Sequence, residues 1–416
     1  MPRCPNGSRK NKKGICVPTT EKKIKKRKKK KNIKLIAPKK KMEKPDCIKL
    51  FELIKSNNDL LKLETKDFFA IKKCQSDTNR AILKTDKFPF LYPHLDDSNF
   101  TEKITRKKEF FDTRAKKITR KEINNIEKEA EKICDPTREF ELAPHQMFVR
   151  NFLSFQTPYN SLLLFHGLGT GKTCSSISVC EEMRIYLNQL GVKKKIIIVA
   201  SPTVQTNYRL QLFDHRKLKN INGQWNLKSC TGNSFINEIN PMQMKGLSRD
   251  KLIYQIDKII NQSYEFLGYT GFANYINNII IKNLPKDSDN EKKRRNKIKA
   301  IRHEFSNRLI TIDEVHNIRN VDGMKGTSEK FLELVTYAEN MKLLLLTATP
   351  MFNDYKEIIW LTNLMNLNDN RYPILISDVF DKYGKFKKED GKDVGKELLI
   401  QKSTGYVSYV KGENPF

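Results

Sequence analysis

A glycine-rich run between an apolar stretch and a helix-like segment constrains the fold of this chain more than any other feature. The apolar stretch, Leu162–Phe165, has the character of a buried strand, and the residues after Lys172 have helical spacing. A strand, a glycine-rich loop and a helix in this order form a phosphate-binding loop, because backbone N–H groups and the helix N-terminus attract an anion. The predicted loop consists of His166, Gly167, Leu168, Gly169, Thr170, Gly171, Lys172 and Thr173.

Two residues of this loop have side chains that suit a nucleoside triphosphate. We expect Lys172 to reach the β- and γ-phosphates and to act in catalysis, and the Thr173 hydroxyl to hold Mg²⁺. The strict pattern asks for glycine at position 166, where this chain has His166. A glycine-rich turn that binds nothing is the alternative, and the flanking strand and helix argue against it.

An acidic pair follows a second apolar strand, at Asp313 and Glu314. An NTPase needs such a pair opposite its phosphate loop. We expect Asp313 to bind Mg²⁺, Glu314 to orient and deprotonate the attacking water, and His316 to link this site to the next motif. A surface acidic turn is the alternative, and the position after a strand and after Lys172 argues against it.

Three weaker signals depend on their order along the chain. The run Thr347, Ala348 and Thr349 ends another strand, and its hydroxyls are expected to connect hydrolysis to a nucleic-acid groove. Pro202 and Thr203 end the second strand, where a hydroxyl and a backbone N–H group suit a phosphate of nucleic acid. Gln146 precedes the phosphate loop, and its amide is expected to pair with the adenine edge.

Short apolar runs predict the strands of an α/β fold. They lie at Leu162–Phe165, Ile196–Ala200, Leu309–Ile312 and Leu343–Leu346, with helical segments between them. Nearly continuous apolar strands are typical of a parallel sheet that helices cover on both faces. The charged residues 282–300 are expected to form an exposed insertion or a helix end.

These motifs, in this order, resemble the first motor lobe of superfamily 2 helicases and translocases. The resemblance is strongest to the poxvirus-like nucleoside triphosphatase I and early transcription factor small subunit family of large DNA viruses. It is carried by Leu162–His166, Asp313–Asn317, Thr347–Asn353 and Gly405–Val410, and it covers about residues 140–416. Histidine at the first loop position is similar to that family's loop.

The resemblance implies a RecA-like parallel sheet flanked by helices, the first helicase lobe, and an ATP-dependent motor in viral transcription. It implies nucleic acid, DNA or RNA, as a partner, viral RNA polymerase as a further partner, and the virion and host cytoplasm as locations. Such motors close ATP between two RecA-like lobes, and the second lobe supplies arginines from a Gln-x-x-Gly-Arg-x-x-Arg motif. This sequence contains no such motif, so we expect the second RecA-like lobe to be absent or in another chain. Hydrolysis by this chain alone is then expected to be weak.

Charge and composition divide the chain further. Its net charge is +31, and residues 1–50 hold 20 Lys and Arg against three acidic residues. We expect residues 1–45 to be a disordered basic tail, either a nucleic-acid arm, a nuclear-import signal or a solvated tail without a specific role. Residues 46–135 are expected to form a helical N-terminal module, 136–366 the ATP-binding domain, and 367–416 an extension toward a missing second lobe. The residues after position 50 also carry a net positive charge, which suits an anionic partner.

The spacing of the cysteines and the length of the apolar runs argue against zinc-binding, membrane-spanning and secreted proteins. None of the eight cysteines forms a C-x-x-C pair, which argues against zinc and favours a reducing compartment, with Cys174 and Cys180 as small buried thiols. Cys4 and Cys16 could pair in an oxidising particle. No apolar stretch approaches ~18 residues and the N-terminus lacks an apolar signal core, so we expect no membrane partner and no secretion.

Two other functions stay open at this stage. The chain could be a non-catalytic adaptor that tethers nucleic acid or RNA polymerase through a degenerate motor lobe. Intact Lys172, Thr173, Asp313 and Glu314 argue against decay of the site. A P-loop kinase is the third alternative, and the acidic pair with the Thr-Ala-Thr run fits it poorly.

Overall fold

The computed structural model describes residues 8–10, 16–18, 91–114, 140–242, 244–283, 290–320, 325–351 and 354–411. The chain divides into two units, Met1–Asp46 and Cys47–Phe416. In the first unit, β1 (Ser8–Lys10) pairs antiparallel with β2 (Cys16–Pro18). The expectation of a disordered tail is therefore wrong for these two strands. It rested on the Lys-rich run that begins at Lys22, beyond both strands, and the rest of that tail lies outside the described residues.

The second unit is built on a six-stranded sheet in which every pair of neighbouring strands is parallel. The four strands expected from apolar runs are confirmed, and two further strands complete the sheet. The order across the sheet is β10, β3, β9, β8, β4, β7. Their bounds are Ser161–His166 (β3), Ile196–Val199 (β4), Tyr264–Leu267 (β7), Leu309–Ile312 (β8), Lys342–Thr347 (β9) and Val407–Val410 (β10).

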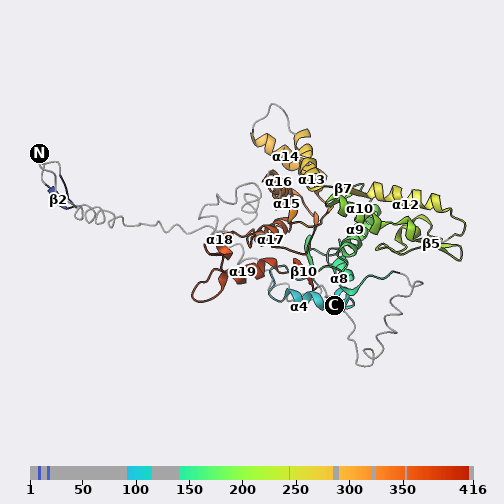
Figure 1. Cartoon of the computed structure of the whole chain (residues 1–416), viewed down its shortest axis with the longest axis horizontal. Coiled ribbons are helices and arrows are strands. Elements are labelled where there is room, and N and C mark those ends of the chain that lie inside the picture. The colour runs from blue at the N-terminus through green and yellow to red at the C-terminus, as the bar shows by residue number, and fades with distance from the viewer. Residues whose placement is uncertain are drawn as a thin grey trace, which may run out of the picture. The chain divides into compact units, whose positions relative to one another are not determined.

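Helices connect these strands, as the alternation of patterns predicts (Figure 1). A small antiparallel hairpin also lies between β4 and β7, formed by β5 (Leu218–Ile221) and β6 (Gln224–Leu227) after the 3₁₀ turn His215–Lys217. The helices are α4 (Phe100–Thr105), α5 (Lys108–Phe111), α8 (Pro144–Phe152), α9 (Lys172–Gln189), α10 (Pro202–Leu212), α11 (Ser234–Ile239), α12 (Arg249–Ser263), α13 (Tyr269–Lys282), α14 (Asn290–Phe305), α15 (Asn317–Asn320), α16 (Lys325–Tyr337), α17 (Glu357–Asn368), α18 (Ile376–Val379) and α19 (Val394–Ser403).

The strand order determines where the connecting helices lie. From β3 the chain crosses to β4 and then to β7 in one direction along the sheet, and it returns through β8 and β9 to β10 in the other. Because parallel crossovers are right-handed, the two directions place α9, α10 and α12 on one face and α13, α16 and α17 on the other. The connections after β3 and β9 therefore diverge to opposite faces. Such a switch point leaves a crevice at the carboxyl ends of the strands, where α/β proteins bind ligands.

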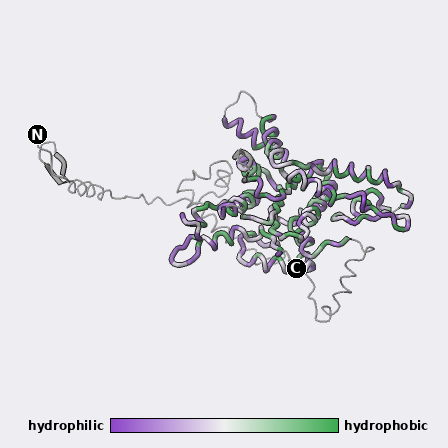
Figure 2. Tube along the Cα trace, viewed as in Figure 1, coloured by the Kyte–Doolittle hydropathy of each residue, from purple (hydrophilic) through white to green (hydrophobic). Residues whose placement is uncertain are grey.

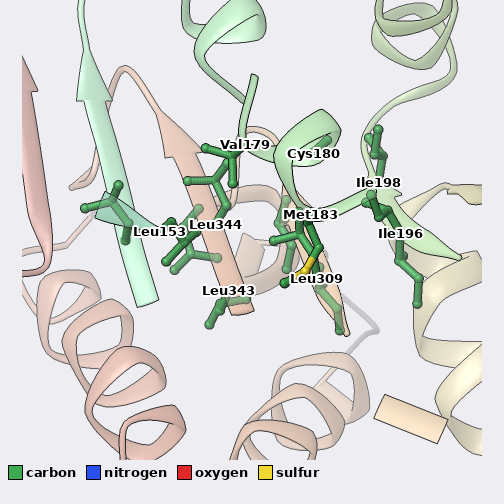
Figure 3. Packing of buried hydrophobic residues seen from close by; sticks show 14 of the residues in the cluster. Leu153, Val179, Cys180, Met183, Ile196, Ile198, Leu309, Leu343 and Leu344 are labelled. Carbon is green, nitrogen blue, oxygen red and sulfur yellow. The ribbon is translucent and has the colours of Figure 1, made fainter. Parts of the chain in front are cut away.

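Helix α9 is the centre of the hydrophobic core on its face. It packs on β8 between α8 and α10, and its residues from Ser175 to Arg184 include nine that are buried in succession or nearly so. Figure 3 shows Val179 and Met183 of α9 reaching toward the strand residues Leu344 and Leu309. Burial of the apolar residues of α9 contributes about 25 cal/mol per Å² of surface removed from water, and this burial stabilises the packing of the helix on the sheet.

Residues 91–114 join this same core. Phe100 of α4 packs edge-on against Phe152 of α8 and Tyr159, and the Tyr159 hydroxyl donates a hydrogen bond to the Pro93 carbonyl (2.8 Å). Residues 91–114 therefore pack in the same core as α8, although a domain boundary is expected between them at residue 135. The aromatic contacts of α4 and α5 with α8 are the reason. The remainder of the expected helical module, 46–90 and 115–139, lies outside the described residues.

The C-terminal segment also belongs to the sheet. Val407–Val410 forms β10 and pairs in parallel with β3, so that Val410 stands opposite His166. Residues 367–416 are expected to form an extension toward a missing second lobe, and the structure places β10 of this segment in the sheet of the present lobe. Among the helices of the described residues, none is long and apolar enough to cross a membrane.

The charged segment 282–300 is mostly helix rather than loop in its described part. α14 is strongly polar along its length, and Figure 2 shows mainly hydrophilic colours on this helix. Its last two turns bury Ala300, Ile301 and Phe305 against neighbouring helices α13 and α16. A narrow apolar stripe is therefore enough to fix a helix whose other residues are charged.

The packing of α4 gives a test of the shared core. Phe100→Ala should lower the free energy of unfolding by about 3–5 kcal/mol, because Phe100 is 3 % exposed and leaves a cavity in the core. Phe111→Ala is the matched control, since Phe111 is 52 % exposed, and it should cost about 1 kcal/mol or less. Urea unfolding followed by fluorescence measures both. Equal, small effects would show that residues 91–114 fold apart from the sheet.

Candidate active site

The phosphate loop connects β3 to α9 and needs glycine at two positions. Gly169 and Gly171 have φ values of +79° and +77°, in the left-handed region that other residues rarely adopt. A Cβ atom at Gly171 would also lie 2.6 Å from Nε2 of Gln146. His166, by contrast, is the last residue of strand β3, where extended backbone accepts any side chain. This explains why the loop tolerates histidine at its first position.

Contacts from three elements hold the loop in shape. The Thr170 hydroxyl donates to the Gly167 carbonyl (2.8 Å), and His145 Nε2 of α8 lies 3.0 Å from the Thr170 carbonyl oxygen. The Gly167 N–H donates to the carbonyl of Val410 at the end of β10 (2.9 Å). Leu168, at the tip, is 81 % exposed. The loop is thus fixed at its flanks and open at its tip.

The buried side chain of His166 links the phosphate loop to the neighbouring elements. Its side chain is fully buried, with Nε2 2.9 Å from the Ser408 hydroxyl and its ring edge-on to His145 at 5.7 Å between centroids. Burial, together with the neighbouring His145 and Lys172 charges, lowers the pKa of His166 to about 4. The imidazole is therefore neutral at physiological pH. Sequence reasoning missed Ser408 because β10 was not expected in the sheet.

Gln146 is buried in the first turn of α8 and holds the loop through its amide. Its Oε1 accepts a hydrogen bond from the Ala143 N–H (2.9 Å), and its Nε2 donates to the Gly171 carbonyl (3.3 Å). One N–H and one lone pair of the amide are thereby engaged within the protein. Pairing of Gln146 with adenine stays a prediction, and the structure adds a contact with the phosphate loop.

The acidic pair lies where β8 ends. The Asp313 carboxylate is nearly buried and accepts a hydrogen bond from the Glu314 N–H (3.0 Å). Burial raises the pKa of Asp313 to about 6 with help from the Glu314 charge, while that N–H and the Lys172 ammonium oppose the rise. Lys172 therefore lies close enough to Asp313 for their charges to interact, so strand pairing has brought the two motifs together.

Glu314 has a backbone conformation that is costly for this residue. Its φ is +45°, in the left-handed region, which costs a residue other than glycine about 1–3 kcal/mol. Strain of this kind clusters at functional sites, where surrounding contacts must hold it. The neighbouring backbone supplies some of these contacts, since the Asp313 N–H donates to the Val199 carbonyl (2.9 Å) and the Val315 N–H to the Leu346 carbonyl (3.1 Å).

Nδ1 of His166 is buried without a hydrogen bond in the described part of the chain, and so are two atoms of charged side chains in this site. These two atoms are Nζ of Lys172 and Oε2 of Glu314, although Oε2 lies 3.4 Å from Nδ1 of His316. Buried polar groups in folded proteins nearly always have partners. An ammonium and a carboxylate oxygen left in this way fit a phosphate group and an attacking water.

The residues present also fit Mg²⁺ held together with a nucleotide. No group of three or more His, Cys, Asp or Glu that could hold a metal occurs among the described residues. Mg²⁺ commonly takes one or two protein oxygens and completes its octahedron with water and substrate phosphates. Thr173 and Asp313 could supply those protein oxygens.

His316 and Thr347 join the acidic motif to the Thr-Ala-Thr run. His316 Nδ1 lies 3.2 Å from the Thr347 hydroxyl, which accepts a hydrogen bond from the Thr349 N–H (3.0 Å). Thr347 is fully buried, so it belongs to the link between the motifs and not to a surface contact with nucleic acid. Thr349 is exposed and Ala348 is half-buried.

A further part of this edge was missed in the sequence. Pro202 and Thr203 are exposed at the start of α10, after β4, and their contact with nucleic acid stays a prediction. Strand β7 pairs with β4, and the residues after it, Gly268 to Thr270, begin α13 at the same edge. The strand escaped prediction because it is short and contains the charged Glu265.

One cysteine differs from expectation. Cys174, in the first turn of α9, forms a disulfide with Cys230, and Cys180 is the free buried thiol of the described residues. The expectation of a free thiol at Cys174 is therefore wrong. The two residues are 56 positions apart in sequence, and the fold brings their Cα atoms within 5.2 Å. Burial raises the pKa of the Cys180 thiol to about 12, so it stays protonated.

A parallel sheet whose carboxyl edge joins a phosphate loop to an Asp-Glu pair defines a RecA-like P-loop lobe. A family model described as the SNF2-related domain matches residues 145–395, and the chain belongs to that family.

Similar proteins occur in large DNA viruses. Two proteins of Acanthamoeba polyphaga mimivirus bear the name of an ATP-dependent RNA helicase. One is 24 % identical over 78 % of this chain and 27 % of its own length, the other 28 % identical over 78 % and 48 %. An African swine fever virus protein named early transcription factor large subunit homolog is 22 % identical over 78 % of this chain and 34 % of its own length. The chain thus spans between about a quarter and a half of these relatives.

The buried imidazole of His166 gives a pH-dependent prediction. Its folded-state pKa of about 4 lies below the ordinary 6.5, so its contribution to stability is complete above pH 6.5 and is lost as the pH falls toward 4. The loss amounts to at most about 3 kcal/mol. His166→Gln, which does not titrate, should lose correspondingly less stability between pH 7 and pH 4 in chemical unfolding. An equal loss of stability in wild type and in His166→Gln would contradict the lowered pKa of His166.

Proposed function

We propose that this chain is the ATP-binding lobe of a nucleic-acid-dependent ATPase, of helicase or translocase type, that acts in viral transcription. The observation that supports this most is that Nζ of Lys172 and Oε2 of Glu314 are buried without hydrogen bonds among the described residues, and that both charges act on Asp313. A structural ion pair would have satisfied both. A triphosphate and an attacking water would satisfy them instead.

Each residue then has a distinct part in hydrolysis. Lys172 and the N–H groups of the loop bind the β- and γ-phosphates, helped by the dipole of α9. Thr173 and Asp313 hold Mg²⁺, which neutralises phosphate charge when bound. Glu314 orients the water and accepts its proton. His316 and Thr347 transmit the state of this site to the exposed turn at Thr349.

Nucleic acid is the partner that the charge of the chain favours. Duplex or single-stranded phosphates would lie along the carboxyl edge formed by the loops after β4, β7 and β9, at Thr203, Thr270 and Thr349. Helix N-termini at α10 and α13 attract anions there. The net charge of +31 adds long-range attraction.

The viral relatives support the biological part of the proposal. Their names include ATP-dependent RNA helicase and early transcription factor large subunit homolog. We infer action with viral RNA polymerase, in the virion and the host cytoplasm, and a second RecA-like lobe in the same or another chain. The second lobe would supply the arginines that stabilise the transition state, worth about 10³–10⁵ in rate.

Two substitutions separate binding from turnover. Lys172→Ala should weaken binding of Mg²⁺·ATP at least about tenfold, because the buried cation contacts the phosphates directly. Glu314→Gln should leave binding within about twofold and reduce nucleic-acid-stimulated hydrolysis at least about a hundredfold, because the base is lost. A fluorescent ATP analogue measures binding, and phosphate release measures turnover. Unchanged turnover in Glu314→Gln would show that another group is the base.

The same assay separates the alternatives when its nucleic-acid component is varied. Duplex DNA, single-stranded DNA and RNA are added in turn to the wild-type chain. A motor lobe raises its ATPase rate with at least one of them. A tethering adaptor binds nucleic acid in a salt-sensitive manner with no change in ATP turnover, and a kinase ignores all three.

A further inference from the structure

Tyr269 occupies a position between the nucleic-acid edge and the acidic pair. It is the first residue of α13, directly after β7 and the cap residue Gly268, and its side chain is half-buried. Thr270, the next residue, is exposed at the edge of the sheet. The side chain of Tyr269 runs from this edge toward the end of β8, where the acidic pair begins.

The Tyr269 hydroxyl is held by hydrogen bonds on both sides. It donates to the carbonyl of Asp313 (2.9 Å), and it accepts from the side-chain amide of Asn317 (3.3 Å). The backbone of Ser201, in the loop after β4, also lies near it. One oxygen atom thus contacts two segments that meet at the carboxyl edge: the loop after β4, and the segment after β8 that carries the acidic motif and the start of α15.

The carbonyl that accepts this hydrogen bond lies directly before the strained residue Glu314. It belongs to the peptide between Asp313 and Glu314, and the φ of +45° at Glu314 sets the orientation of that peptide. Rotation of the peptide toward an ordinary φ would move the carbonyl away from Tyr269 and redirect the Glu314 side chain. The hydrogen bond from Tyr269 therefore opposes relaxation of the strained residue.

We propose that Tyr269 is a positioning residue that couples contact with nucleic acid at the start of α13 to the orientation of Glu314. The proposal rests on the proposed ATPase function and adds to it a route between the two sites. A phosphate that binds beside Thr270 displaces or fixes the first turn of α13, and the tyrosine transfers that change to the Asp313–Glu314 peptide. Tyr269 itself touches neither ATP nor the attacking water.

A second tyrosine on the same helix provides a matched control. The Tyr275 hydroxyl donates to Glu304 (2.5 Å) and accepts from Arg308 (3.2 Å), and its side chain is also half-buried. Arg308 precedes β8, so this cluster lies at the amino end of the strand, opposite the acidic pair. Tyr275→Phe therefore removes a comparable hydroxyl without contact with Glu314.

The test compares Tyr269→Phe with Tyr275→Phe and wild type in the full chain. Phenylalanine keeps the ring and removes the hydroxyl alone. In Tyr269→Phe, hydrogen exchange of the amides at 314–317 should accelerate about five- to tenfold, the factor expected for one lost hydrogen bond. The kcat of ATP hydrolysis with nucleic acid should fall about tenfold, with the KM for ATP within about twofold of wild type. Tyr275→Phe should change neither.

Three outcomes contradict the proposal in distinguishable ways. Unchanged exchange at 314–317 in Tyr269→Phe would show that the hydroxyl does not hold this peptide. Faster exchange with an unchanged kcat would show a structural contact without coupling. A wild-type chain whose ATP turnover does not respond to any nucleic acid would overturn the proposed function itself, and the coupling with it.

Discussion

Parallel pairing of β3 with β9, of β9 with β8 and of β8 with β4 determines where the phosphate loop, the acidic pair and the Thr-Ala-Thr run lie. Parallel strands end at the same edge of a sheet, so the segments after them meet although they are far apart in sequence. Lys172, Asp313 and Thr347 come together for this reason alone. The buried apolar strands and α9 are the physical basis of the site.

Buried charged groups favour the binding of a phosphate group at this site. A lysine nitrogen and a glutamate oxygen are shielded from water without hydrogen bonds in the described residues, and Asp313 has a raised pKa beside them. Such an arrangement costs stability, and it persists because the surrounding core is extensive. The same burial strengthens electrostatic contacts with a bound phosphate, because the effective dielectric constant is lower than in water. The strained backbone of Glu314 likewise costs stability at a functional site.

Local patterns were sufficient to predict the centre of the lobe. Strands β3, β4, β8 and β9 are mostly apolar and buried, so their sequences alone indicate strands. The glycines of the phosphate loop and the Asp-Glu pair depend on their immediate neighbours, and Lys172 does lie close enough to Asp313 for their charges to interact.

Features that depend on distant partners could not be predicted in this way. Strand β10 has alternately exposed residues and only four positions, and its place beside β3 follows from tertiary packing. The bond between Cys174 and Cys230, and the hydroxyl of Tyr269 against Asp313, join segments separated by tens of residues. Residues 91–114 were assigned to another module because nothing in their own sequence reveals that Phe100 packs on Tyr159.

The most direct measurement is a crystal structure of this chain with Mg²⁺ and a non-hydrolysable ATP analogue. In the proposed function, the carboxyl edge of the sheet holds Mg²⁺·ATP between the phosphate loop and the acidic pair. We predict the triphosphate along residues 167–173, with Lys172 Nζ bonded to its terminal phosphates and Mg²⁺ between Thr173 and Asp313. Nucleotide bound at a different place on the lobe, or a loop that stays empty at saturating nucleotide, would contradict the account.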